Sequence, residues 1–358
     1  MTSAADARAA AHRRVQQHAV DRPEVAGAFL TGSVTALAPD AELPATSDVD
    51  VVVVLRNGPA VPAKPGKLRC DGVLLEVTEL PWSEVADPAV VARTHYLAPS
   101  FAGDHVLADP TGHLARLRTE IAPSFAAPEA VQARCEDVLI RMVTRSAALD
   151  PAAPWHEQVL TWLFPATLPT QVPLVAALRP PTVRRRFVAA REVLAEHGQL
   201  ELYGSLVDLV DAGGRDGSAV QHHLDQLEPV LDQVASVART PFPFSADLTP
   251  DARPVTVQGS RELVAAGDHR EAVFWVVATW GRCLTVLTTD APSLVVSRAA
   301  QRFREVTADL LGVSTPAALA ARRDAALALV PAVRAAGERI IDVRQVRAQA
   351  RPEVGRSG

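Results

Sequence analysis

Two short apolar runs near the N-terminus predict buried strands. VAGAFLT at residues 25–31 and VDVVVVL at 49–55 are rich in apolar and β-branched residues, and each has the length of a strand rather than of a helix. Residues 4–20 before them read as an amphipathic helix, and residues 33–37 as a short helix or turn. The stretch APDAELPATS at 38–47 is polar and contains prolines, which predicts a loop.

The next segments extend this pattern to a small mixed sheet. KLRCDGVLLEVTEL at 67–80 predicts a hairpin or a long bent strand, with Asp71-Gly72 at the turn. Residues 81–98 predict one or two helices, and HVLAD at 105–109 predicts a last short strand before another helix. We therefore expect an α/β domain over residues 1–122.

Helical periodicity dominates the rest of the chain. No convincing strand follows residue 127, and the connections are rich in proline, as in helical bundles. We expect helices over 127–149, 153–167, 182–197, 217–238, 260–290 (broken near 267) and 314–347. The predicted fold class is α+β, with a small mixed-sheet domain followed by an all-α helical bundle over 123–350 and a cleft between them.

Composition narrows the function classes. The chain has 358 residues and a net charge of −5, which gives no reason to expect a nucleic-acid-binding surface. Three widely spaced cysteines suggest neither a metal cluster nor a disulfide framework. We find no signal peptide and no apolar run approaching the ~20 residues of a membrane span. A cytoplasmic location without membrane or nucleic-acid partners is therefore expected, while the oligomeric state stays open.

Two aspartates at the start of an apolar strand are the most informative feature. Asp48 and Asp50 are two residues apart, so both carboxylates face the same side of the strand. Converging carboxylates repel one another, and a bound Mg²⁺ is a common way to neutralise them. Glu76, a single acid among apolar residues of the next strand, is the best third ligand, whereas Glu79 lies on the opposite face. We predict Mg²⁺ on Asp48, Asp50 and Glu76.

Gly32-Ser33 supplies a second part of this predicted site. Glycine permits close backbone approach at a strand end, and a serine that opens a helix offers N–H groups and a hydroxyl to the terminal phosphates of a nucleotide. A lone Gly-Ser pair or a lone D-x-D is uninformative. The ordered combination of strand, Gly-Ser, loop, D-h-D strand and acid-bearing strand is far more specific.

This combination resembles the DNA polymerase β-like nucleotidyltransferase superfamily, and the bacterial streptomycin/spectinomycin-type aminoglycoside nucleotidyltransferases in particular. The resemblance rests on Leu30-Thr31-Gly32-Ser33, on Asp48-Val49-Asp50-Val51 and on LEVTEL at 75–80, and it covers residues 24–80 best. It implies Mg²⁺ held by Asp48 and Asp50, with Glu76 as catalytic base or as a further metal ligand. It also implies ATP or another NTP as donor, bound partly by Gly32 and Ser33.

The helical half shows one segment similar to that family. GDHREAVFWVVATWGRCLTVL at 267–287 resembles a helix whose early arginine reaches the nucleotide phosphates, which would be Arg270 here, with Arg282 as a weaker candidate. A surface charge or a structural ion pair is the alternative for both arginines.

The expected activity is Mg²⁺-dependent transfer of AMP, or another NMP, to a hydroxyl of a small molecule such as an aminoglycoside. A different small-molecule acceptor such as a lincosamide, a protein acceptor, and a non-catalytic nucleotide-binding regulator remain alternatives.

Overall fold

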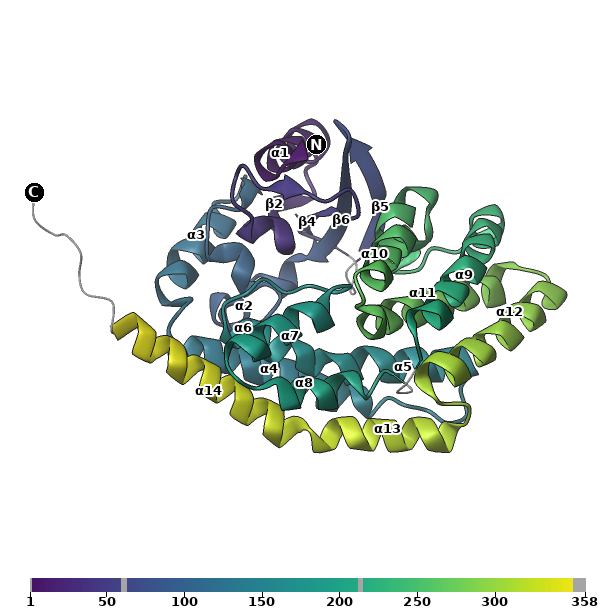
Figure 1. Ribbon diagram of the computed structural model, residues 1–358. Coiled ribbons are helices and arrows are strands. Elements are labelled where there is room, and N and C mark those ends of the chain that lie inside the picture. The colour runs from purple at the N-terminus through teal and green to yellow at the C-terminus, as the bar shows by residue number, and fades with distance from the viewer. Residues whose placement is uncertain (1, 59–62, 212–214, 350–358) are drawn as a thin grey trace, which may run out of the picture.

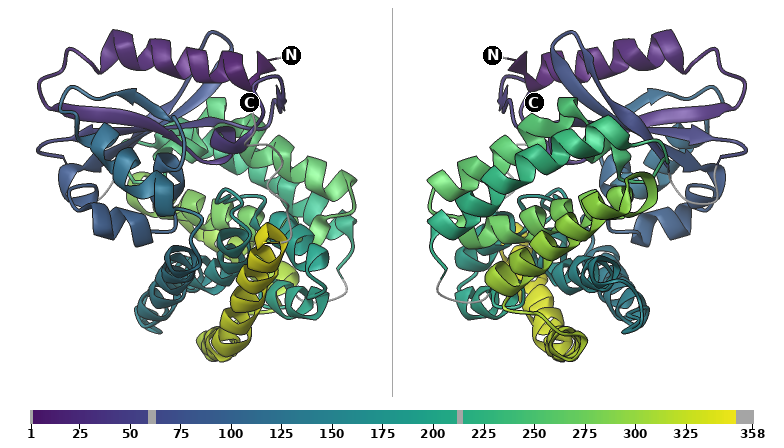
Figure 2. Two further views of the ribbon diagram at one scale, coloured as in Figure 1. Left: turned by 90° about the vertical axis from the view of Figure 1, so that its left-hand side faces the viewer. Right: turned by 90° about the vertical axis from the view of Figure 1, so that its right-hand side faces the viewer.

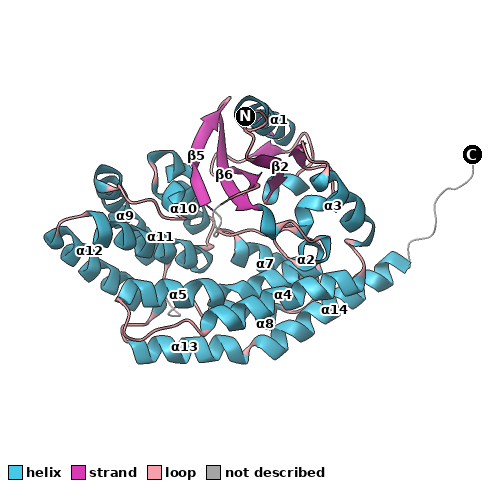
Figure 3. Cartoon of the chain, turned by 180° about the vertical axis from the view of Figure 1, so that it is seen from behind, coloured by secondary structure: helices cyan, strands magenta, loops and turns pink. Residues whose placement is uncertain are grey.

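The computed structural model describes residues 2–58, 63–211 and 215–349, and it has the predicted α+β architecture. All strands lie in the N-terminal third of the chain, and helices make up the remainder (Figure 1, Figure 3). The helical part lies below the sheet in the view of Figure 1, and α13 and α14 form its outer edge.

The main sheet has five strands in the order β5-β6-β4-β2-β7. Its strands are β2 (Val25–Thr31), β4 (Val49–Leu55), β5 (Ala63–Cys70), β6 (Val73–Pro81) and β7 (Val106–Ala108). Only β4 and β6 are paired in parallel, and the other neighbours are antiparallel. A separate two-stranded pairing joins β1 (Thr2–Ser3) to β3 (Glu42–Leu43).

The β5–β6 hairpin turns at Asp71 and Gly72, as the sequence predicts. Both residues have positive φ, 49° and 80°, which an Asp-Gly pair in a two-residue hairpin turn accommodates. The strand before this turn begins at Ala63, earlier than the proline- and glycine-containing sequence suggested.

Each face of the sheet is covered by helix. Helix α1 (Ala4–His18) is capped by Ser3 and packs its buried alanines on one face, with Val51 and Val53 of β4 in the same core. The other face packs against α2 (Pro88–Arg93) and α3 (His113–Ile121), and Val52 and Val54 point there. Figure 2 shows α1 on the side of the sheet away from the helical part.

The helical part has a single large core centred on α11 (His269–Asp290), in which Trp280 is almost fully buried. The other helices are α4 (Pro128–Ser146), α5 (Trp155–Thr167), α6 (Gln171–Ala176), α7 (Arg186–Glu196), α8 (Leu200–Val207), α9 (Gly217–Val237), α10 (Gly259–Ala265), α12 (Ser293–Val306), α13 (Pro316–Ala328) and α14 (Val330–Gln349). Phe125 packs against the core of the sheet, whereas Val131 belongs to the core of the helical part. The domain boundary at 122/123 stays a prediction.

Three helices were not expected from the sequence: α6, α8 and α12. The segment 314–347, expected as one helix, is two helices that meet at Leu329.

Two segments are long and apolar enough to cross a membrane, Trp155–Ala176 and His269–Asp290, so our expectation that no such segment exists is wrong. In each, 78% of the 18-residue window is buried inside the protein, and a core helix passes the same test. This is therefore weak support for a membrane span.

Candidate functional site

The pairing of three strands brings the predicted site residues together at one end of the sheet. In the parallel β4–β6 pair, Asp50 lies directly opposite Glu76. In the antiparallel β2–β4 pair, Asp50 lies opposite Thr31, so Gly32 follows at the end of β2. Asp50 and Glu76 are therefore neighbours across two strands, with the Gly32 backbone beside them.

Gly32 is required by this arrangement. Its φ of 71° lies in the left-handed region, which residues with a side chain rarely adopt. A Cβ added at Gly32 would overlap Asp50 Oδ2 and would lie 3.1 Å from Asp50 Cγ. Ser33, which is exposed, begins the short 3-10 helix η1 (Ser33–Ala36) directly after it.

Two lysines from the edge strand β5 lie among the carboxylates. Lys67 is paired with Glu76 across the hairpin, and only 2% of its side chain is exposed. Its ammonium donates to Asp48 Oδ2 and lies 2.6 Å from Glu76 Oε1. Lys64, which is partly exposed, donates to the other oxygen of Glu76. These are the only two lysines in the whole sequence, and every other basic residue apart from histidine is arginine.

The helical part adds one more acid and one more cation. Asp247, in the 3-10 helix η6 (Ser245–Leu248), is buried and places Oδ1 3.3 Å from the Lys67 ammonium. Its other oxygen accepts a hydrogen bond of 2.7 Å from Arg282 on α11. Arg282 in turn lies against three aromatic rings, those of Phe164, Phe244 and Trp275.

We call these seven residues the carboxylate–lysine cluster: Asp48, Asp50, Lys64, Lys67, Glu76, Asp247 and Arg282. Four acids and three cations give it a formal charge of −1. Burial, together with the nearby charges of Asp48 and Glu76, holds the pKa of Asp50 well above its usual range.

The lysines and carboxylates stabilise one another's charged forms. Burial alone would lower the pKa of Lys67, but the carboxylates of Asp48, Glu76 and Asp247 outweigh it and raise that pKa. Burial would likewise raise the pKa of Glu76, but the ammonium groups of Lys64 and Lys67 lower it. The cations that these converging acids require are therefore present within the chain itself.

The donor types suit Mg²⁺, but the predicted metal site is not assembled in this arrangement. Carboxylate oxygens are the ligands Mg²⁺ prefers, and the Lys67 ammonium marks a point where Asp48 and Glu76 converge. Across residues 2–58, 63–211 and 215–349, no three His, Cys, Asp or Glu side chains are grouped so that they could hold a metal ion. Magnesium on Asp48, Asp50 and Glu76 stays a prediction that requires Lys67 to move.

Arg270 lies away from the cluster, although we expected it there. Its guanidinium donates to Asp211 and, at 2.6 Å, to Asp208, both in the helical part. It stands twelve residues before Arg282 on the same helix, or roughly 18 Å along the axis. The structural ion pair offered as the alternative is what Arg270 forms, and Arg282 is the arginine of α11 that reaches the cluster.

Three residues of the cluster were missed in the sequence. Lys67 could have been found by counting the hairpin register from the Asp71-Gly72 turn, because that count puts Lys67 opposite Glu76. Lys64 does not follow from this count, because the register shifts between Ala63 and Gly66. Asp247 lies in a proline-rich stretch that we read as a simple connection, and only tertiary packing brings it to the sheet.

The loop before β4 is tied directly to the helical part. Arg184 donates to the carbonyl oxygens of Gly259, at 2.6 Å, and Thr46, at 3.1 Å. The Thr46 hydroxyl donates to Glu262 Oε2 at 2.7 Å. These bonds fix the segment just before Asp48, so the position of its carboxylate depends on both parts of the chain.

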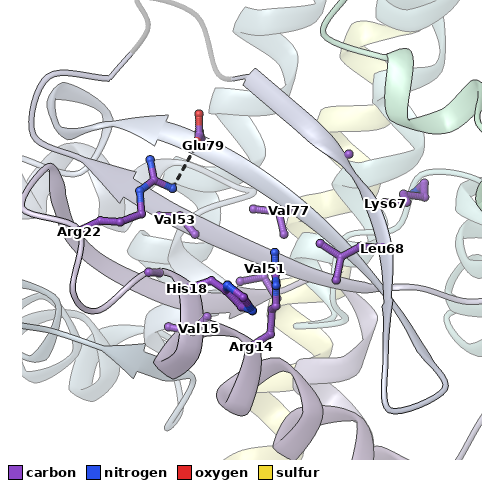
Figure 4. A pocket seen from close by; sticks show the side chains of 12 residues that line it. Arg14, Val15, His18, Arg22, Val51, Val53, Lys67, Leu68, Val77 and Glu79 are labelled. Carbon is purple, nitrogen blue, oxygen red and sulfur yellow. Dashed lines mark ion pairs between the residues drawn. The ribbon is translucent and has the colours of Figure 1, made fainter.

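A cavity of about 350 Å³ lies on the other face of the sheet (Figure 4). Helix α1 contributes Arg14 and His18, and Arg22 follows it and forms an ion pair of 3.6 Å with Glu79. Because side chains alternate along a strand, the face that carries Glu79 is opposite to the face that carries Glu76. Lys67 also lines this cavity, so the cavity adjoins the carboxylate–lysine cluster at that residue, although Glu76 lies on the other face.

Comparison with known proteins adds little to this picture. No protein-family model matches the chain, and no curated protein matches it. Among solved structures, a nucleotidyltransferase-like protein from Exiguobacterium sibiricum covers 58% of this chain and 68% of its own, with 11% identity and a TM-score of 0.28. A TM-score this low carries no argument, so any functional conclusion has to come from the cluster itself.

Proposed function

We propose that this protein is a nucleotidyltransferase that moves the NMP group of ATP or another NTP to a hydroxyl of a small molecule. The observation that supports this most is the juxtaposition of Gly32, Asp50 and Glu76 on three strands at one end of the sheet. Gly32 has a positive φ and lies against the Asp50 carboxylate, and Glu76 adds a second carboxylate on the parallel strand. This arrangement costs stability, and binding or catalysis would explain it.

The residue roles follow from their positions. Asp48 and Asp50, with Glu76 as a further ligand or as the base, would hold Mg²⁺, which when bound neutralises phosphate charge. Gly32 and Ser33 would contact the triphosphate. In the transfer, the acceptor oxygen forms a bond to the α-phosphorus and the bond to the bridging oxygen of pyrophosphate breaks. Glu76, if it is not a ligand, would accept the proton of the attacking hydroxyl.

A small polar acceptor suits the charge of the chain better than a nucleic acid does. The net charge of −5 would attract a polycation such as an aminoglycoside and repel a polyanion. Asp247 and Arg282 bring the helical part against the cluster, so this part is placed to contact an acceptor.

A second candidate function is nucleotide binding without transfer. The observation that favours it is the pairing of Lys64 and Lys67 with the carboxylates, because these lysines neutralise the acids without a metal ion. A protein that only binds a nucleotide would have no need to release this pairing.

The decisive experiment measures pyrophosphate release with Mg²⁺, each NTP, and pooled aminoglycosides and lincosamides. Asp50→Asn and Glu76→Gln should each lower the release by about 10²-fold or more. Glu79→Gln is the matched control, because it removes an acid three residues further along the same strand on the opposite face. Drug-dependent release that requires Asp50 and Glu76 would support the proposal. Nucleotide binding without release would favour the second candidate, and neither binding nor release would refute both.

A further inference from the structure

Lys67 is buried in a way that is rare for a lysine. Only 2% of its side chain is exposed, and its ammonium contacts carboxylates from three different segments: Asp48 before β4, Glu76 on β6 and Asp247 on η6. Lysine is almost never fully buried unless its charge is paired. A chain with only two lysines places both of them here, so the choice of lysine over arginine is specific to this cluster.

The shape of the ammonium explains that choice. It is a compact point charge that can approach several carboxylates at once, whereas the planar guanidinium of arginine suits two parallel hydrogen bonds to one partner. In charge and in size, an ammonium among three carboxylates is close to a small cation. Lys67 therefore occupies the kind of position that a metal ion takes in a cluster of acids.

The ammonium and a divalent ion cannot share this position. Lys67 Nζ lies 2.6 Å from Glu76 Oε1 and is bonded to Asp48, while Mg²⁺ would need the same oxygens at roughly 2.1 Å. With three cations already present against four acids, adding a divalent ion would bring the cluster from −1 to +1. A metal could bind well only if Lys67 left or if additional negative charge arrived.

A nucleoside triphosphate would provide that additional charge. Its phosphates would give the ammonium another anionic partner and would supply oxygens to the metal. Lys67 starts from β5, at the edge of the sheet, and reaches both the sheet carboxylates and Asp247 of the helical part. If Lys67 exchanged its carboxylate partners for phosphates, contacts in both the sheet and the helical part would therefore change.

We infer that Lys67 is a built-in cation that holds the metal position of the nucleotide-free protein, so that a divalent ion enters only together with a nucleoside triphosphate. This inference rests on the proposed function for its nucleotide-linked step. Lys67 is here a positioning residue, because it acts by occupying the carboxylates.

The test measures binding of Mn²⁺, a paramagnetic substitute for Mg²⁺, through the loss of the free-ion electron paramagnetic resonance signal. The wild type should bind Mn²⁺ weakly alone and at least about tenfold more tightly with a non-hydrolysable ATP analogue. Lys67→Met, which keeps the apolar stem and removes the charge, should bind Mn²⁺ without nucleotide at least about tenfold more tightly than the wild type. Lys64→Met is the matched control and should change Mn²⁺ binding less, because Lys64 contacts Glu76 alone among these carboxylates and is partly exposed.

Tight Mn²⁺ binding by the wild type without nucleotide would overturn the inference and leave the proposed function untouched. A folded Lys67→Met that binds Mn²⁺ no better than the wild type would also overturn it. If Lys67→Met binds Mn²⁺ while the wild type binds neither Mn²⁺ nor nucleotide, Lys67 holds the metal position but the proposed function fails. If Lys67→Met does not fold, the wild-type titrations decide: Mn²⁺ has to appear with the nucleotide analogue and not without it, and any other result overturns the inference.

Discussion

Gly32→Ala should destabilise the protein by more than its backbone conformation alone explains. With φ 71° and ψ −161°, Gly32 lies in a region that is essentially restricted to glycine, and a residue with a Cβ there costs roughly 1–3 kcal/mol. The new methyl group would also overlap Asp50 Oδ2, and rotation of the carboxylate cannot relieve the contact with Asp50 Cγ at 3.1 Å. Overpacking of this kind costs typically about 1–3 kcal/mol. The expected total is about 2–6 kcal/mol of unfolding free energy.

Two comparisons separate the backbone contribution from the steric one. Gly72→Ala is the matched control, because Gly72 has φ 80° and nothing within 4 Å of an added Cβ, so it should cost only about 1–2 kcal/mol. In an Asp50→Ala background the nearest remaining atom is the Cβ of residue 50, at 3.6 Å. There, Gly32→Ala should cost only its backbone contribution of about 1–3 kcal/mol.

Urea unfolding of the four variants in this cycle, followed by circular dichroism, gives the coupling free energy between positions 32 and 50. We expect at least about 1 kcal/mol of coupling. Additive costs would show that Asp50 does not press on Gly32 and would refute this account of the site.

Three further predictions concern the rest of the molecule. Burial raises the pKa of Cys135 and Cys283 to about 12. A thiol reagent at pH 8 should therefore label Cys70 alone in the native protein and all three cysteines after unfolding. Rapid labelling of all three cysteines in the native protein would contradict this. Burial lowers the pKa of His156 below the ordinary value of about 6.5, so its contribution to stability is complete above that pH and is lost as the pH falls. His156→Gln should therefore lose less stability than the wild type between about pH 7.5 and pH 5, and an identical loss in thermal melts would refute the assignment. Arg282→Gln should lower the free energy of unfolding by about 3–5 kcal/mol, because it leaves Asp247 buried with one cation fewer. Arg334→Gln, which breaks an exposed ion pair with Glu136, should lower it by at most about 1 kcal/mol. Similar losses for the two variants in urea unfolding would contradict the buried pairing.

The strands that carry the candidate site could be predicted closely from the sequence. The bounds of β2 and β4 agree with the prediction because their apolar and β-branched runs are bounded by polar residues or turns. Helix α12 was missed, although its buried residues Ala299, Phe303 and Val306 have helical spacing. Its first turn contains two valines and a serine, whose helix propensity is weak, and its packing against α11 overrides that propensity.

The cluster itself shows where local sequence stops being informative. The position of Asp50 opposite Glu76 follows from two strand assignments and one pairing, which a pattern can suggest. The contact of Asp247 with Lys67 depends on how a connection 180 residues further along the chain folds back on the sheet. No periodicity encodes such a contact, and the same is true of the placement of Arg270 away from the cluster.

The restriction of lysine to two positions has a consequence for the covalent chemistry of this protein. Reagents and enzymes that acylate lysine side chains have only Lys64 and Lys67 to act on, and Lys64 is the more accessible of the two. Acetylation of either residue would remove a positive charge from among the carboxylates. Any lysine acylation of this chain is therefore a modification of the carboxylate–lysine cluster, and coupling to a surface through either lysine would alter the region that a binding experiment sets out to measure.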